Sequence, residues 1–157
     1  MQTPTKIAAK FSAIDAHDDT IESIEVTPAI GRKSCRVKLT LYRHWEKKHR
    51  SLEFIGCANI SMMADTTVIL NNAPSNTCCL EASAAVGDIV KIMRSQRKAW
   101  NVTYQKSIDP LPIKIASAKN FVLFRVRLFG GNLEIVAKSF KFSRLTLHPS
   151  ERRSGAA

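Results

Sequence analysis

The residues most suggestive of chemistry are His17, Asp18 and Asp19, a histidine followed by two aspartates near the start of the chain. A metal-dependent hydrolase with adjacent histidine and aspartate needs further histidines to complete its metal shell. His44 and His49 are five residues apart, about 140° around a helix, whereas zinc proteases place two histidines four residues apart on one face. On a strand the two aspartates would point to opposite faces. The pattern therefore predicts no metal, no cofactor and no catalytic residue here.

A structural role explains the same residues. "TIESIEV" follows them directly and places β-branched residues at alternate positions, which predicts a strand from Thr20. Aspartate side chains accept backbone N–H groups in turns, so the two aspartates are expected to start this strand. His17 is expected to hydrogen-bond in the same turn. The acids of this region could also complement a basic neighbouring strand; they are Asp15, Asp18, Asp19, Glu22 and Glu25.

Other catalytic arrangements are absent from the sequence. There is no glycine-rich phosphate loop, no Gly-x-Ser-x-Gly elbow and no pair of carboxylates with an obvious site for a raised pKa. None of the four cysteines forms a Cys-x-x-Cys pair, and adjacent Cys78 and Cys79 have the wrong spacing for a zinc knuckle. We expect free thiols and a protein that is not an enzyme.

The elements around the histidine and aspartates are mostly strands. "SCRVKLTLYR" alternates apolar and polar residues, as a half-buried strand does. Pairing it with the strand from Thr20 predicts Ile24 opposite Val37 on the inside and Glu25 opposite Arg36 on the outside.

The strongest hairpin signal lies near the C-terminus. In "FVLFRVRLFGGNLEIVAKSFKF", two alternating runs flank Gly130 and Gly131, which predicts a two-residue loop. Pairing outward from that loop places Leu128 opposite Leu133 inside, with Arg127 and Glu134 paired outside. Two phenylalanines further along have the opposite parity, and a bulge near residues 138–139 would return them to the core; they are Phe140 and Phe142.

Weaker patterns complete the chain. "SLEFIGCANI" predicts one strand and "TTVIL" another, while "EASAAVGDIVKIMRSQRKA" fits either a helix or a short strand. "WNVTYQ" and "PIKIAS" have strand-like alternation. Ile7, Phe11 and Ile14 share one face of a short N-terminal helix.

The fold class predicted is mainly β (α+β), an antiparallel sheet of hairpins forming a curved sandwich or open barrel with one or two short helices. Residues 1–16 are expected to form an N-terminal segment with the short helix, residues 17–145 a single β-rich domain, and residues 146–157 a flexible tail. No apolar run approaches the roughly 20 residues of a membrane span, and the N-terminus has no secretion-signal pattern. We therefore expect a cytoplasmic protein that does not bind membranes.

The charge of the chain suggests an anionic partner. The formal net charge is +11, and residues 91–106 hold five bases and no acid. Four bases alternate with core residues on the two best-defined strand patterns, where they could form a basic sheet surface for nucleic acid; they are Arg36, Lys38, Arg125 and Arg127. A basic surface with no specific partner explains the charge equally well.

Four segments resemble a known group of proteins: "HDDTIESIEV", "VKLTLY", "LEFIGCANI" and "LFGGNLEIVAKSFKF". They are similar to a loose group of small bacterial β-rich proteins with an N-terminal His-Asp-x-x-(Ile/Val) motif directly before the first strand. His17, Asp18 and Ile21 match that motif. Some members resemble immunity proteins of polymorphic toxin systems. Immunity proteins against nucleases usually look acidic and this chain is basic, so the resemblance does not extend to a nuclease target.

The resemblance implies a protein-binding module without catalysis. The sequence therefore favours a protein partner, with His17, Asp18 and Asp19 as the candidate patch. Nucleic acid bound by the four strand bases is the alternative.

Overall fold

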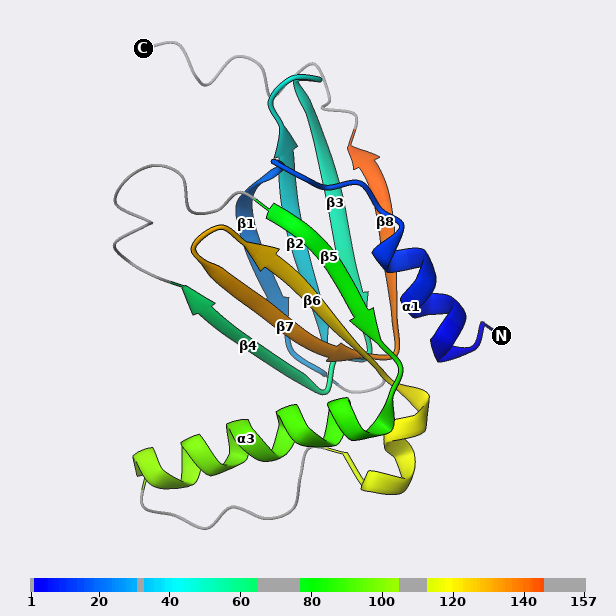
Figure 1. The fold of residues 1–157 in the computed structure, drawn as a ribbon, viewed down its shortest axis with the longest axis vertical. Coiled ribbons are helices and arrows are strands. Elements are labelled where there is room, and N and C mark those ends of the chain that lie inside the picture. The colour runs from blue at the N-terminus through cyan, green and yellow to red at the C-terminus, as the bar shows by residue number, and fades with distance from the viewer. Residues whose placement is uncertain (1, 31–32, 65–76, 105–112, 146–157) are drawn as a thin grey trace.

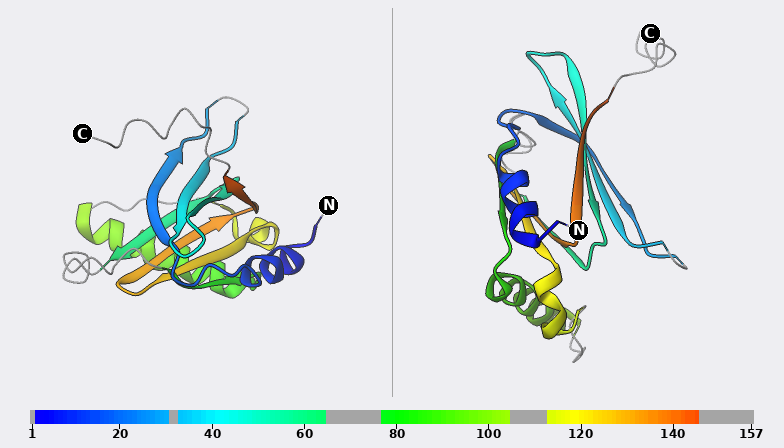
Figure 2. Two further views of the ribbon diagram at one scale, coloured as in Figure 1. Left: turned by 90° about the horizontal axis from the view of Figure 1, so that it is seen from above. Right: turned by 90° about the vertical axis from the view of Figure 1, so that its right-hand side faces the viewer.

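The computed structural model describes residues 2–30, 33–64, 77–104 and 113–145, except the side chains of residues 64, 78, 100–104 and 145. Within these residues, eight strands form two four-stranded antiparallel sheets that pack as separate layers, with no closed barrel (Figures 1 and 2). The mainly β fold predicted from the sequence is confirmed in its sandwich form.

The first sheet has the strand order β1-β2-β3-β8, made of β1 (Thr20–Thr27), β2 (Arg36–Arg43), β3 (Lys48–Ile55) and β8 (Ser139–Leu145). The predicted β1–β2 register is wrong by two residues, because Ile24 lies opposite Leu39 and Glu25 opposite Lys38. Ile24 nevertheless packs against the core as predicted, since a two-residue shift preserves the face on which a side chain lies.

The second sheet has the order β4-β7-β6-β5, made of β4 (Asn59–Ala64), β5 (Thr77–Ser83), β6 (Val122–Leu128) and β7 (Gly131–Ala137). The predicted hairpin of β6 and β7 exists, but its loop is Phe129-Gly130, so Leu128 pairs with Gly131. This register pairs Arg125 with Glu134, and the two side chains form an ion pair of 2.9 Å.

The chain crosses between the two sheets at two neighbouring places. "SLEFIGCANI" is not one strand, because β3 ends at Ile55 and β4 begins at Asn59 in the other sheet. Gly56 bends this link with φ +70°, a left-handed conformation that favours glycine. The bulge predicted near residues 138–139 is instead the second crossing, where Lys138 N–H donates to Ile55 O. The crossing places Phe140 against the core.

The core between the sheets is closed along one side by α1 (Pro4–Ser12), which lies along β5 and β8 (Figure 1). The predicted N-terminal helix is thereby confirmed. Phe11 is fully buried, and its ring packs edge-on or tilted against those of Phe54, Phe124 and Phe140. The N-terminal segment therefore shares one hydrophobic core with the β-rich region.

A second cluster lies on the outer face of the second sheet, where α3 (Val86–Tyr104) and the 3-10 helix η1 (Ile115–Asn120) pack. Ile89 and Met93 of α3 contact this sheet around Leu123 and Val136. The sequence allowed either a helix or a short strand in "EASAAVGDIVKIMRSQRKA", and the structure has a helix from Val86 onward. The prediction of strands at "WNVTYQ" and "PIKIAS" is wrong for the residues that the structure describes. The first segment forms the end of α3, and the second forms the start of η1. "TTVIL" lies outside the described residues.

None of the described helices is both long enough and apolar enough to cross a membrane.

Candidate functional site

The two aspartates of the initial motif have opposite environments. Asp19 is completely buried, and its carboxylate accepts from Arg43 Nε at 2.7 Å and from Arg50 Nη1 at 3.3 Å. Arg43 and Arg50 continue the inner-face alternation of β2 and β3, so the strand pattern directs both guanidinium groups inward. Two buried cations and one buried carboxylate therefore form the centre of an ion-pair network.

Two further carboxylates complete the network from the surface. Asp15 accepts from Arg43 Nη1 at 3.1 Å, and Glu46 accepts from the same atom at 3.3 Å. The hydrogen bond from Arg43 lowers the pKa of both carboxyl groups. Burial alone would lower the pKa of Arg43, but its bonds to Asp19, Asp15 and Glu46 outweigh burial, so that this pKa is raised.

The same network fixes the backbone between α1 and β1. Arg43 and Arg50 each donate to Asp15 O at 2.7 Å. Thr77, at the start of β5, accepts from Asp18 N and donates its own N–H to Asp19 O, both at 2.8 Å. The Thr77 hydroxyl donates to Ala16 O and to Asp19 O. Residues 15–19 are thus anchored to both sheets.

His17 and Asp18 lie on the exposed side of this anchored segment. His17 Nδ1 is 2.9 Å from the Asp18 carboxylate, and Asp18 has φ +60°, the left-handed conformation that aspartate and asparagine tolerate best among non-glycine residues. The His17 ring meets that of Phe129 edge-on, with centroids 6.1 Å apart. Phe129, at the β6–β7 turn, is 54% exposed.

An exposed tryptophan is linked to the same segment through Arg43. Trp45, in the turn between β2 and β3, is 57% exposed, and the Arg43 guanidinium lies 4.6 Å from its ring centroid. Arg43 in turn binds Asp15, so Trp45 is linked through Arg43 to the segment that carries His17. We call His17, Trp45 and Phe129 the aromatic rim. Figure 1 shows the chain from α1 passing over β2 and β3 before it enters β1.

The sequence pointed to His17, Asp18 and Asp19 but not to the other residues of this site, which are Arg43, Arg50, Trp45 and Phe129. The sequence does contain a signal for Arg43, because strand alternation places it on the same inner face as Leu39 and Leu41. An arginine at an inner position requires a buried acid nearby, and Asp19 was the candidate. Trp45 and Phe129 both occupy turns, where alternation gives no information about exposure.

Two further histidines, His44 and His49, lie on the outer side of the first sheet around Tyr42. Its ring is 4.8 Å, centroid to centroid, from the rings of both His44 and His49. His44 Nε2 is 2.8 Å from the Thr20 hydroxyl, and His49 Nε2 is 3.0 Å from the Glu22 carboxylate. Within the described part of the chain, no three histidine, cysteine, aspartate or glutamate side chains are placed to share a metal ion.

The four bases proposed as a nucleic-acid surface divide between two faces. Arg36 and Lys38 project from the outer side of the first sheet and Arg125 and Arg127 from the outer side of the second, because their neighbours on each strand fill the shared core. Each pairs with a carboxylate: Arg36 with Glu53 at 3.0 Å, Lys38 with Glu25 at 3.8 Å, Arg125 with Glu134 at 2.9 Å and Arg127 with Glu81 at 3.1 Å. The structure therefore does not bring the four together.

The described cysteine side chains are free thiols at Cys35, Cys57 and Cys79. Burial, with a smaller contribution from neighbouring Cys35, raises the pKa of Cys57 to about 12. Its thiol is therefore protonated at neutral pH, and the nucleophilic form of a cysteine is the thiolate.

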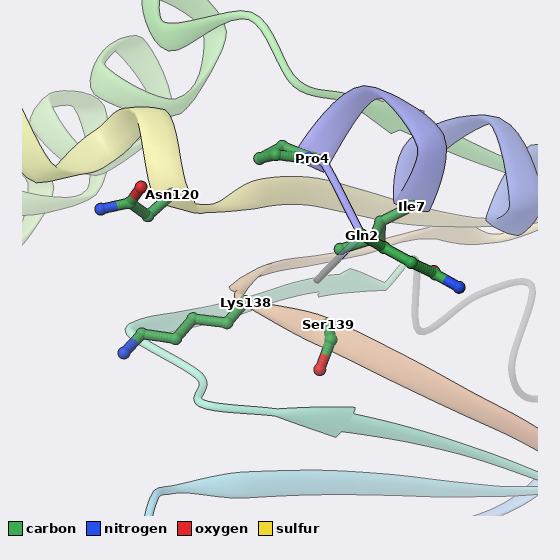
Figure 3. Close-up of a pocket in the computed structure, with 6 residues that line it drawn as sticks. All are labelled: Gln2, Pro4, Ile7, Asn120, Lys138 and Ser139. Carbon is green, nitrogen blue, oxygen red and sulfur yellow. The ribbon is translucent and has the colours of Figure 1, made fainter.

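A cavity of about 530 Å³ lies between the start of α1, the end of η1 and the β7–β8 crossing. Its polar side chains are Gln2, Asn120, Lys138 and Ser139. In Figure 3, Lys138 and Asn120 extend to one side while Gln2 extends to the other, so these groups do not converge on one point. Small-molecule sites need convergent polar groups, and this cavity lacks them.

Comparison with protein-family models, with curated proteins and with solved structures finds no match to this chain. The resemblance to small bacterial β-rich proteins accordingly stays a prediction.

Proposed function

We propose that this protein is a non-enzymatic protein-binding module, and that its partner docks on the aromatic rim of His17, Trp45 and Phe129. The observation that carries the proposal is the exposure of two large aromatic side chains beside a rigidly anchored segment. Tryptophan is among the residues most enriched in the energetic centres of protein interfaces, and phenylalanine is enriched in interfaces generally.

The anchoring of residues 15–19 also favours binding. A binding loop that is already ordered loses little conformational entropy on association. Residues 15–19 are held by hydrogen bonds from Arg43 and Arg50 and by backbone bonds with Thr77. The Trp45 ring stacks on the buried Arg43. The aromatic rim is therefore presented in a fixed arrangement before a partner arrives.

The exposed groups around the rim define the partner's chemistry. Asp15 and Asp18 expose carboxylate oxygens beside the aromatic rings. A complementary protein surface would offer an apolar depression for Trp45 and Phe129, with hydrogen-bond donors at its edge. The resemblance of the His17-Asp18-x-x-Ile21 motif to immunity-like proteins supports a cytoplasmic protein partner of toxin type.

Site-directed photo-crosslinking in the cells that encode the protein tests this proposal. A photoreactive amino acid replaces His17 in one variant and the exposed Lys33, as a control position, in another. Within the His17 variant, Trp45→Ala and Phe129→Ala are compared with Met63→Ala, which removes an equally exposed apolar side chain from β4. Circular dichroism checks that each variant is folded.

The expected result is one discrete, protease-sensitive adduct from position 17 that persists with Met63→Ala and is lost with Trp45→Ala or Phe129→Ala. An adduct that persists in both rim variants, one that forms equally from position 33, or one destroyed by nuclease instead of protease would overturn the proposal. So would the absence of any adduct.

A further inference from the structure

The exposed face of α3 carries a row of bases. Lys91, Arg94 and Lys98 are all exposed, and their spacing of three and four residues places them within about 60° of one another around the helix. Ile89 and Met93, which are buried against the second sheet, lie on the opposite side of α3. We call Lys91, Arg94 and Lys98 the basic stripe; it runs about 10 Å along the helix, at 1.5 Å per residue.

In the part of the chain that the structure describes, no acid compensates the basic stripe. Within the described residues, none of its three side chains forms an ion pair, whereas the bases on the strands of both sheets largely do. The acid nearest in sequence, Asp88, is in the first turn of α3 and accepts from the Ser83 hydroxyl at 2.6 Å. Two further exposed bases lie on or beside η1, which packs against α3; they are Lys114 and Lys119.

The distribution of charge along the chain agrees with this geometry. Residues 1–85 hold ten lysines and arginines against nine aspartates and glutamates, while residues 86–120 hold seven against two. The excess of positive charge therefore begins with α3, and residues 121–145 continue it with five bases against one acid.

The residue types in the basic stripe distinguish nucleic acid from an acidic protein surface as the anionic partner. Protein interfaces need a buried apolar or aromatic centre, and Lys91, Arg94, Ser95 and Lys98 provide none. Contacts to the nucleic-acid backbone use mainly lysine, arginine and hydroxyl groups directed at phosphate oxygens. A 10 Å stripe spans about three phosphates along one strand, at roughly 3.4 Å of axis per phosphate.

We propose that the basic stripe of α3 binds the phosphate backbone of nucleic acid without reading its base sequence. This surface differs from the aromatic rim and does not depend on it. Contacts to phosphate oxygens carry no sequence information, so the affinity is expected to depend on charge and salt and not on base sequence.

Fluorescence anisotropy with labelled 20-mer DNA tests the proposal on the full chain. Two duplexes of unrelated sequence, one single strand and a labelled poly-glutamate of equal charge are titrated between 50 and 300 mM NaCl. The test variant is Lys91→Gln/Arg94→Gln/Lys98→Gln. The matched control, Lys6→Gln/Lys10→Gln/Lys33→Gln, removes the same charge from exposed positions elsewhere.

The expected result is that wild type binds both duplexes equally. In the test variant, the magnitude of the slope of log affinity against log salt concentration decreases by about 2–3, since each phosphate contact contributes about 0.9. At 100 mM salt this change corresponds to an affinity loss of about a hundredfold, while the control retains affinity within about threefold. Equal losses in the two variants, no binding of wild type at 50 mM salt, or poly-glutamate binding as tight as DNA would each overturn the proposal.

Discussion

At the residue scale, the pair Asp18-Asp19 shows how the fold separates two identical side chains. Asp18 is exposed beside His17, whereas Asp19 is buried between Arg43 and Arg50. The strand predicted from Thr20 is present, but the predicted role of the two carboxylates is wrong, because Asp18 pairs with His17 and the turn is held by backbone bonds to Thr77. The sequence could not identify which aspartate is buried, because that depends on arginines more than 20 residues away.

Replacing each aspartate by asparagine measures this difference. Asp19→Asn leaves two buried guanidinium groups without the buried carboxylate that they share, while Glu46 still contacts both from the surface. Breaking a buried ion pair in this way costs about 3–5 kcal/mol. Asp18→Asn is the matched control. It removes only an exposed pair with His17, worth about 0–1 kcal/mol, and asparagine tolerates the positive φ of this position.

Urea denaturation of wild type and the two variants gives the free energies of unfolding. We expect the midpoint to fall strongly for Asp19→Asn and hardly at all for Asp18→Asn. Two variants of equal stability would mean that the buried network contributes no net stability through Asp19.

At the element scale, sequence alternation assigned faces correctly but not registers. Both predicted strand pairs, β1–β2 and β6–β7, are displaced by two residues in the structure. A two-residue shift keeps every apolar side chain on the inner face, so hydrophobic pattern cannot detect it. The position of the turn decides the register. The pair Gly130-Gly131 predicted a loop at those two residues, whereas Phe129-Gly130 forms the loop.

Alternation failed altogether at the end of α3. Trp100, Val102 and Tyr104 alternate with polar residues, yet this segment continues a helix that begins at Val86. The helix is established by its earlier turns, where Ile89 and Met93 pack on the second sheet. Packing of that kind overrides local β propensity, and no local pattern reports it.

The packing of α1 into the sandwich yields a prediction with a matched control. Phe11→Ala removes a fully buried ring from contact with Phe54, Phe124 and Phe140, which costs about 3–5 kcal/mol. Phe129→Ala makes the same chemical change at an exposed turn and costs about 0.5 kcal/mol or less. Thermal unfolding followed by circular dichroism compares them. If Phe11→Ala melted with wild type, α1 would be a dispensable attachment and not part of the core.

At the scale of the whole molecule, the basic stripe and Phe129 of the aromatic rim lie toward opposite ends of the second sheet. The α3 helix packs around Leu123 at the start of β6, whereas Phe129 lies just beyond the end of the same strand. At 3.3 Å per residue these positions are about 20 Å apart. That separation is about twice the distance over which charges interact at physiological salt, and Phe124, Val126 and Leu128 of the packed core lie along it.

The two surfaces are therefore expected to act independently. Sites separated by more than about 10 Å with no shared partners give additive effects, so Trp45→Ala and Phe129→Ala should leave the DNA affinity and its salt slope unchanged. Saturating duplex should likewise leave the yield of the adduct from position 17 within about twofold. Competition between duplex and adduct would show that one partner covers both surfaces, and the basic stripe would then belong to the same interface as the aromatic rim.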